Sequence, residues 1–328
     1  MCRMKFLVLG AAFLVSSVFM FWNLENCFDP ADDPAVRDEE FTPAGERHWT
    51  WNKLNRKLNG VAKVIVAARD TYGDYPALVG LCEVENAAVL RKLVSIKMMD
   101  KLGYDWVHRD SPDARGIDVA LLFRKSRFRP MVVRAVPVPT DPPTRDILYV
   151  KGLLDGEPVH VLVNHWPSKL GGSAGTARRL AAAATLRACI DSIDAVGNET
   201  GVLCSQTPAQ RSETVIIMGD FNATPAEIDQ ALAGFQNALP GFENLAAPLA
   251  AAGEGSIKYR GTWELIDQFW IRDSLTPPKM SVFRPPFLLE PDPGYTGEKP
   301  RRTWSGPRYK GGLSDHLPVV LVVKNQNE

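Results

Sequence analysis

The sequence predicts a single domain of the α/β class, and three observations predict it. Short apolar runs bounded by turn residues recur along the chain, as is typical of strands. Longer segments between them carry helical spacing or helix-capping residues. Finally, no repeat, low-complexity segment or convincing linker divides the 328 residues, and the 25 glycines and 25 prolines indicate many turns.

Composition and charge exclude several classes of protein. Apolar residues make up 45% and charged residues 23%, as in a folded globular chain rather than a disordered one. The 38 basic residues balance the 38 acidic ones, so bulk charge does not hold a polyanion, and any such contact must be a local patch. The five cysteines form no C-x-x-C pair, which argues against structural zinc.

The N-terminus resembles a targeting segment. Arg3 and Lys5 precede an apolar stretch from Phe6, and Ser16 and Ser17 supply small residues near a possible cleavage point. We therefore predict a signal peptide over residues 1–17, or a retained membrane anchor, followed by one catalytic domain over 18–328. The protein would then be exported (periplasmic or secreted) or anchored at its N-terminus. The alternative is that the whole segment is core and has no targeting function.

The first half of the chain alternates buried strands with helices. Residues 18–22 are uniformly apolar and predict the first strand, and Thr50 predicts the N-terminus of a helix that runs to about Ala68. Asp155 and Gly156 predict a tight hairpin turn. The remaining elements expected here are strands over 76–82, 117–123, 131–138, 148–154 and 158–163, and a short helix over about 87–97.

The second half continues the pattern. An Ala-rich helix is expected over about 176–194, then a polar surface insertion over 196–212. Thr224 and Glu227 form a capping box at the start of another helix. Strands are expected over 214–218, over 263–271 with Asp267 in its middle, and over 317–323, with a long functional loop over 290–313.

Polar residues follow three of the apolar strands as pairs at positions i and i+2. The pairs are Asn23 with Glu25, Glu83 with Glu85, and Asp220 with Asn222. Side chains two apart on a strand share a face, so each pair should project two oxygen groups together. Such oxygen ligands suit Mg²⁺ or Mn²⁺ rather than zinc. Glu85 remains an alternative to Glu83 as the ligand.

With His165 and His316 added to these pairs, the chain resembles the endonuclease/exonuclease/phosphatase family, which has the deoxyribonuclease-I-like fold. The motifs that carry the resemblance occur in the family's order, from residue 18 to about 323. They are Trp22–Glu25, Leu81–Glu83, Arg115–Ala120, Asn164–Pro167, Gly219–Asn222, Ile266–Asp267 and Ser314–Pro318. The resemblance implies a four-layered α/β sandwich, in which two packed, mixed and mostly antiparallel β-sheets are flanked by helices.

The resemblance also implies roles for individual residues. The metal, Mg²⁺ or Mn²⁺, would be held by Glu83 and Asn23, with Glu25 and Asp315 in support. The catalytic set would be His316, oriented by Asp267, together with His165, Asp220 and Asn222. Arg115, Ser168, Arg301 and Arg302 are the candidates for substrate binding. The family commonly has Gln where this chain has Cys82, and it varies at Ser168.

The function implied is hydrolysis of phosphoester bonds by a water that His316 and Asp267 activate. A nuclease is the first expectation. A basic stretch lies just ahead of His316, and it is either a phosphate-binding rim or only a solvated loop; its cations are Lys299, Arg301, Arg302, Arg308 and Lys310. The alternative is a phosphatase or phosphodiesterase for small phosphorylated molecules or lipid head groups. Nucleic acid is thus the expected partner. We expect the protein to be a monomer with no obligate protein partner.

Two further possibilities depend on single residues. Ser173 lies in a G-x-S-x-G sequence, with Asp267 and His316 downstream in the order of a serine hydrolase. No strand directly precedes it, and this hypothesis leaves Glu83 and Asn222 without a role. Cys189 and Cys204 could form a disulfide in an exported protein, although their spacing alone does not establish one.

Overall fold

A computed structural model describes residues 17–169, 172–199, 213–231, 239, 241–272 and 278–323. The predicted leader over residues 1–17 therefore lies outside the described residues, except for Ser17, which already belongs to the first strand and pairs with Val323. Cys204 and residues 200–212 of the predicted insertion over 196–212 also lie outside the described residues. No described helix has both the length and the apolar composition needed to cross a membrane.

Two six-stranded mixed sheets form the centre of the molecule. The first has the order β13 (Lys279–Val282), β18 (Val319–Val323), β1 (Ser17–Cys27), β2 (Leu78–Val84), β4 (Asp118–Arg124) and β3 (Tyr104–His108). The second has the order β5 (Phe128–Val136), β6 (Ile147–Leu154), β7 (Glu157–His165), β8 (Thr214–Asp220), β12 (Asp267–Arg272) and β9 (Glu243–Asn244). Each sheet has one parallel contact, β1 with β2 and β7 with β8, and its other pairs are antiparallel.

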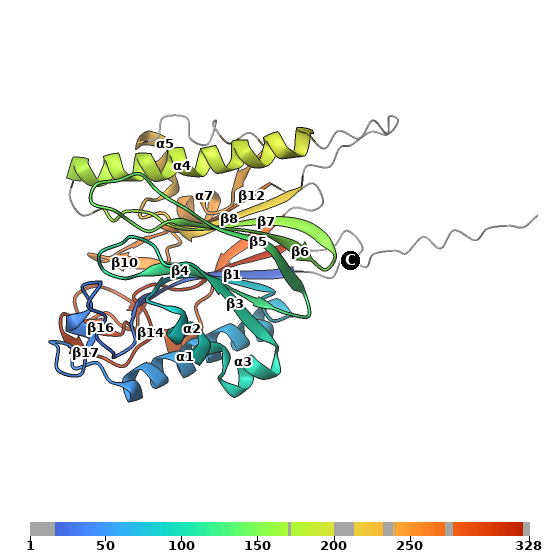
Figure 1. The fold of residues 1–328 in the computed structure, drawn as a ribbon. Helices are drawn as coiled ribbons and strands as arrows, with labels where there is room; N and C mark the ends of the chain where they lie inside the picture. The colour runs from blue at the N-terminus through green and yellow to red at the C-terminus, as the bar shows by residue number, and fades with distance from the viewer. Residues whose placement is uncertain are drawn as a thin grey trace, which may run out of the picture.

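Helices cover the outer face of each sheet, which gives four layers (Figure 1). The helices α1 (Trp51–Tyr72), α2 (Ala87–Val94) and α3 (Lys97–Lys101) lie against the first sheet, and α4 (Gly172–Glu199) and α5 (Pro225–Ala231) lie against the second. Shorter elements are α7 (Ala247–Ala251) and 3₁₀ helices over Glu39–Phe41 and Pro286–Leu288. The four-layered α/β sandwich that the sequence predicts is confirmed.

The layers are held by apolar side chains from both sheets. Phe21 of β1, Leu121 of β4, Val161 of β7 and Met218 of β8 are fully buried in one cluster between the sheets. A second cluster packs α1 on the first sheet, and a third packs α4 on the second. Because both faces of each sheet are covered, the central strands are apolar without interruption, and this explains why their sequences lack the alternation of half-exposed strands.

Local signals predicted the element boundaries well. The side chain of Thr50 accepts a hydrogen bond from the Lys53 amide at the N-terminus of α1. Thr224 and Glu227 cap α5 reciprocally, each side chain accepting from the other's backbone amide. Asp155 and Gly156 both have positive φ, as the tight turn between β6 and β7 requires. These three predictions are confirmed.

Three expectations were wrong or incomplete. Asp267 does not lie in the middle of a strand but begins β12, because the apolar run turns at Leu265 and Ile266 after β11 (Thr262–Glu264). Residues 290–313 are not one loop, since they hold most of two small hairpins, β14 (Leu289–Pro291) with β15 (Glu298–Pro300), and β16 (Trp304–Ser305) with β17 (Arg308–Tyr309). β11 pairs with β10 (Ile257–Tyr259) in a separate hairpin. The edge strand β3 of the first sheet was not predicted from the sequence.

Candidate active site

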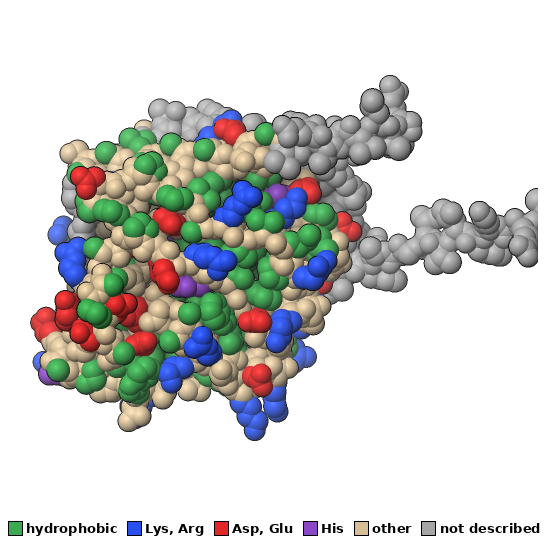
Figure 2. Space-filling view, in the orientation of Figure 1, with side chains coloured by type: hydrophobic (Ala, Val, Ile, Leu, Met, Phe, Trp, Pro, Cys, Tyr) green, Lys and Arg blue, Asp and Glu red, His purple; other side chains and the backbone are tan. Residues whose placement is uncertain are grey.

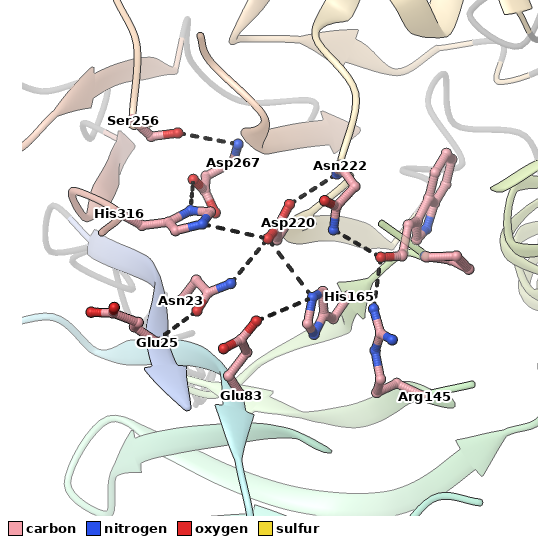
Figure 3. Close-up of polar contacts among 12 residues, drawn as sticks. Asn23, Glu25, Glu83, Arg145, His165, Asp220, Asn222, Ser256, Asp267 and His316 are labelled. Carbon is pink, nitrogen blue, oxygen red and sulfur yellow. Dashed lines mark hydrogen bonds and ion pairs between the residues drawn. The ribbon is translucent and has the colours of Figure 1, made fainter. Parts of the chain in front are cut away.

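The parallel strand pairs bring polar side chains together at one edge of the sandwich. Asn23 on β1 lies beside β2, which ends at Glu83 and Val84, and β7 and β8 end side by side at His165 and Asp220. The carboxyl ends of adjacent parallel strands lie at the same edge of their sheet, so two strand ends from each sheet meet here. Figure 3 shows these side chains pointing toward one another.

His316 and Asp267 form a buried pair. Nδ1 of His316 lies 2.7 Å from Oδ2 of Asp267, and the Asp267 amide donates to Oγ of Ser256 at 3.4 Å. The His316 backbone is fixed as well, because its carbonyl accepts from Nε1 of Trp22 and its amide donates to Oγ of Ser314. Nδ1 is thus occupied by the carboxylate, and Nε2 is the imidazole atom that faces the rest of the site.

Asp220 lies at the centre of the polar network (Figure 3). Its Oδ2 accepts from Nδ2 of Asn23 at 3.0 Å, and its Oδ1 accepts from the Asn222 amide at 2.9 Å. Nε2 of His316 and Nε2 of His165 lie 3.9 Å and 3.8 Å from Oδ2. Burial, followed by the negative charge of Asp267, raises the pKa of Asp220 to about 7.

The two histidines are in opposite electrostatic surroundings. Burial alone would lower the pKa of His316, but the charge of Asp267 and its hydrogen bond hold that pKa well above the ordinary value. Burial lowers the pKa of His165 far below the ordinary value, and the positive charges of Arg145 and Arg115 lower it further. The two imidazoles thus differ in proton affinity, which is raised at His316 and lowered at His165.

His165 also contacts Glu83. Its Nε2 lies 3.9 Å from Oε1 of Glu83, whose other oxygen accepts from the Asn26 amide at 2.7 Å. Nδ1 of His165 is buried and has no hydrogen-bond partner among the described residues. A buried nitrogen without a partner indicates a site that is completed by a bound group or a water molecule.

The ends of the strands adopt unusual backbone conformations. Glu25, Glu83 and Asn222 have φ of 47°, 57° and 48°, in the left-handed region that non-glycine residues rarely enter. At Glu83 the register of β2 against β4 shifts, so Glu83 and Glu85 do not share a face. Glu85 instead accepts from the Asp29 amide, away from the site. The expectation that this pair projects together was wrong, and Glu83 alone reaches the site.

Gly219 shows why the sequence preceding Asp220 needs a glycine. A Cβ at Gly219 would lie 2.5 Å from the backbone oxygen of Asn164 on the neighbouring strand β7. No real side chain tolerates such a distance. The glycine therefore lets β7 and β8 approach, and this approach places His165 and Asp220 directly opposite each other in the ladder.

A pocket of about 270 Å³ opens beside this network. Its lining includes three carboxylates, those of Glu25, Glu83 and Asp315, together with His316 and Arg302. Burial and the nearby negative charge of Asp315 raise the pKa of Glu25 to about 7. Carboxylates crowded in this way favour a bound cation, and their hard oxygens suit Mg²⁺ or Mn²⁺. The residues present fit such an ion.

Glu25 also anchors the neighbouring chain. Its carboxylate accepts from the amides of Thr303 and Trp304 and from Nε of Arg302. These bonds fix the Glu25 carboxylate in the lining of the pocket that Glu83 also lines. Two groups of possible ligand atoms in this network lie within 4.8 Å of one another, namely Asp220, Asp267 and His316, and Cys82, His165 and Asp220. Cys82 is therefore at the base of the site, where burial raises the pKa of its thiol well above the ordinary value.

Two charged residues at the site were missed by the sequence analysis. Arg145 is buried, pairs with Asp113 at 3.1 Å, and donates to the Trp166 carbonyl at 2.8 Å, the same oxygen that accepts from Nδ2 of Asn222. Lys57 is 1% exposed, and its Nζ donates to the Glu25 carbonyl and to Oγ1 of Thr303, both at 2.7 Å. No sequence motif marks either residue, since Arg145 follows a Pro-rich stretch and Lys57 lies on the amphipathic helix α1.

The predicted substrate-binding residues are placed unequally. Arg115 is exposed beside the site, and its Nη2 donates to Oδ1 of Asn26 at 2.7 Å. Arg302 lines the carboxylate pocket but is paired with Asp315 at 2.9 Å. Arg301 lies in a different pocket, described below. Ser168 is exposed, and its carbonyl accepts from Nη1 of Arg179. The structure therefore brings Arg115 and Arg302 to the site and places Arg301 in a neighbouring pocket.

Ser173 does not form the elbow of a serine hydrolase. It is exposed in the first turn of α4, and residues 166–171 separate the end of β7 from that helix. Asp267 contacts His316 instead, and His316 also lies near Asp220. The serine-hydrolase alternative therefore has no support in the described residues.

Fold and site together define a member of the deoxyribonuclease-I-like class. The family comparison agrees, since a profile of the Endonuclease/Exonuclease/phosphatase family matches residues 18–325. The chain belongs to this family. A search of curated proteins finds no match.

Solved structures share the fold at low sequence identity. A humanized D. rerio TDP2 has 16% identity and a TM-score of 0.57, with 94% of this chain and 99% of that chain covered. The human Nocturnin catalytic domain has 16% identity and a TM-score of 0.56, with coverage of 94% and 93%. A mannosyl-6-phosphatase of Bacteroides thetaiotaomicron has 15% identity and a TM-score of 0.56, with coverage of 94% and 99%.

Proposed function

We propose that the protein is a divalent-metal-dependent hydrolase of phosphoester bonds. The observation that carries the proposal is the convergence of the Asp267–His316 pair and Asp220 beside a pocket lined by Glu25, Glu83 and Asp315. The family's own name describes nucleases and phosphatases, which share this chemistry. Mg²⁺ or Mn²⁺ bound by Glu83 and Asn23, with Glu25 and Asp315 in support, would neutralise the phosphate and stabilise the leaving oxygen.

Protein side chains would position the phosphate, the attacking water and the leaving oxygen. Asp267 fixes Nδ1 of His316, so Nε2 is the atom that contacts the phosphate group or the attacking water. Asp220 accepts from Asn23 and Asn222, so its carboxylate is held in place to orient that water. His165 lies on the other side of Asp220, where it serves the leaving oxygen.

The arrangement of charges favours a small phosphorylated substrate over a polynucleotide. Of the loop cations expected to contact a polynucleotide, Arg302 pairs with Asp315 and Lys299 lies 3.7 Å from Asp292, whereas Arg301 and Lys310 line another pocket. Figure 2 shows basic and acidic side chains interspersed over one face, with acidic ones gathered where Figure 1 places β16 and β17. That face offers no continuous basic track for a phosphate backbone.

A nuclease is the second candidate, and two observations support it. A D. rerio TDP2 structure with the same fold, at 15% identity, is complexed with a single-strand DNA product. Arg115 is exposed beside Asn26, at a place where it would contact a phosphate next to the cleaved bond. The Bacteroides thetaiotaomicron structure, named as a mannosyl-6-phosphatase, supports the first candidate to a similar degree.

A substrate panel tests both candidates. Purified protein with Mg²⁺ or Mn²⁺ would be assayed on a hexose 6-phosphate, inositol phosphates, a chromogenic phosphodiester, single-stranded DNA and RNA, with His316→Ala as the control for contaminating activity. We expect a small phosphoester to be hydrolysed with the highest kcat/KM. Faster cleavage of DNA or RNA would establish the nuclease instead. Hydrolysis of no member of the panel, or equal hydrolysis by His316→Ala, would refute the proposed function.

A further inference from the structure

A second pocket, of about 310 Å³, lies on the other side of the segment that carries Arg301 and Arg302. Arg56 and Lys57 of α1 line it from one side, and Arg301, Lys310 and the pair Gly311 and Gly312 line it from the other. No carboxylate is among the lining residues. We call this the basic pocket. The carboxylate pocket beside His316 has a separate lining, with Arg302 rather than Arg301.

The cations of the basic pocket are not neutralised. Arg56, Arg301 and Lys310 are exposed, and within the described part of the chain none of them has a carboxylate within 4.0 Å. Arg302 differs, because it pairs with both Glu25 and Asp315. Three unpaired cations around one hollow repel one another, and an anion between them would relieve that repulsion.

The backbone of the pocket adds donors. The amides of Lys310 and Leu313 donate to backbone carbonyls, but within the described residues the intervening amides of Gly311 and Gly312 have no acceptor. Gly311 is left-handed, with φ of 75°. A Cβ at Gly312 would lie 2.0 Å from the Arg301 carbonyl oxygen, so only glycine fits there. Successive amides around a left-handed residue are a known form of anion-binding concavity.

Lys57 lines the pocket from its buried side. It is 1% exposed, its Nζ is held by the Glu25 carbonyl and by Oγ1 of Thr303, and burial lowers its pKa. The positive charge of the pocket therefore comes mainly from Arg56, Arg301 and Lys310. Because Thr303 also donates its amide to the Glu25 carboxylate, the wall between the two pockets is a hydrogen-bonded unit.

We propose that the basic pocket binds a phosphate group, separately from the catalytic pocket. Two guanidinium groups and an ammonium group suit a phosphate, which accepts paired hydrogen bonds from arginine. The volume is at the lower end of the range of ligand pockets, roughly 300–1,000 Å³, and admits free phosphate or a small phosphorylated molecule. The site does not depend on the proposed function, since it shares no lining residue with the carboxylate pocket.

Binding of inorganic phosphate and of a hexose 6-phosphate to the full chain tests the proposal by isothermal titration calorimetry. The buffers would be freed of divalent metal on a chelating resin, because a soluble polyanionic chelator could itself enter the pocket. The test variant is Arg56→Gln/Arg301→Gln, and the matched control is Arg308→Gln, which removes an exposed arginine of the same segment that lines neither pocket. Thermal melts would show that each variant is folded.

We expect saturable binding that weakens on the order of tenfold or more in Arg56→Gln/Arg301→Gln and is nearly unchanged in Arg308→Gln. Lys310→Gln, a milder change at an exposed position, should weaken it in the same direction. The probe that binds more tightly identifies the source of the phosphate. Absence of saturable binding, or a loss in Arg308→Gln as large as that in Arg56→Gln/Arg301→Gln, would overturn the proposal.

Discussion

The 2.7 Å contact between Asp267 Oδ2 and His316 Nδ1 joins the two sheets of the sandwich at the candidate active site. Asp267 begins β12 of the second sheet, and His316 precedes β18 of the first. Residues that lie 49 positions apart are thus paired only after both sheets have packed. The reactive geometry of His316 is a product of the sandwich as a whole.

Replacement of His316 tests its role in the reaction. His316→Ala should lose about 10²–10⁴-fold in kcat, the usual contribution of a positioned acid–base group. Asp267→Asn should lose less, because it only orients the ring. Both rates would be measured on the best substrate of the panel, with circular dichroism as the check on folding. A folded His316→Ala protein with a near-normal rate would contradict the role.

Arg145 offers a test of the buried charges around the site. It pairs with Asp113, and both side chains are at most 8% exposed. Arg145→Met leaves Asp113 as a buried unpaired charge, so the free energy of unfolding should fall by about 3–5 kcal/mol. The double variant Arg145→Met/Asp113→Leu should recover much of that loss. Urea denaturation measures both, and equal stability of the parent and Arg145→Met would show that the ion pair contributes nothing.

His160 gives a test by pH. Burial lowers its pKa, and Glu213 opposes this only in part. The unfolded chain therefore takes up a proton below pH ~6.5 that the folded chain resists. The free energy of unfolding should fall as the pH drops below that value, until the folded pKa is passed. His160→Gln should show a shallower fall between pH 7.5 and 5.5 in urea denaturation, and an unchanged slope would contradict the assignment.

The leader predicted from the N-terminal sequence has its own test. The leader is predicted to end at residue 17, and Ser17 already pairs with Val323 while its Oγ accepts from Nη2 of Arg127, so cleavage there would remove the first residue of β1. N-terminal sequencing of the protein from its native host should begin near Val18. A chain that begins at Met1 and remains in the cytosol would refute export, whereas one that begins at Met1 in a membrane fraction would support the anchor.

Much of the fold and site followed from sequence because the relevant signals are local. The Thr50 cap, the Asp155–Gly156 turn and the polar residues at the ends of apolar strands each depend on a few neighbouring residues. The order of the motifs then indicated the family.

The rest depended on contacts between distant segments. The left-handed conformation of Glu83 separates it from Glu85, and nothing in the sequence Cys82 to Glu85 requires that conformation. Arg145 and Lys57 are single basic residues whose partners lie far away in the chain. Arg301 and Arg302 are neighbours that face different pockets, which a count of cations in the loop does not reveal.

The rate of phosphoester hydrolysis as a function of added metal tests the central claim most directly. The chain would be stripped of metal, assayed on its best substrate in EDTA, and then titrated with Mg²⁺ or Mn²⁺ beside a Glu83→Gln variant. We expect no turnover in EDTA, recovery with either ion, and for Glu83→Gln a need for at least about tenfold more metal. Full activity in EDTA, or an unchanged metal requirement in Glu83→Gln, would contradict the account.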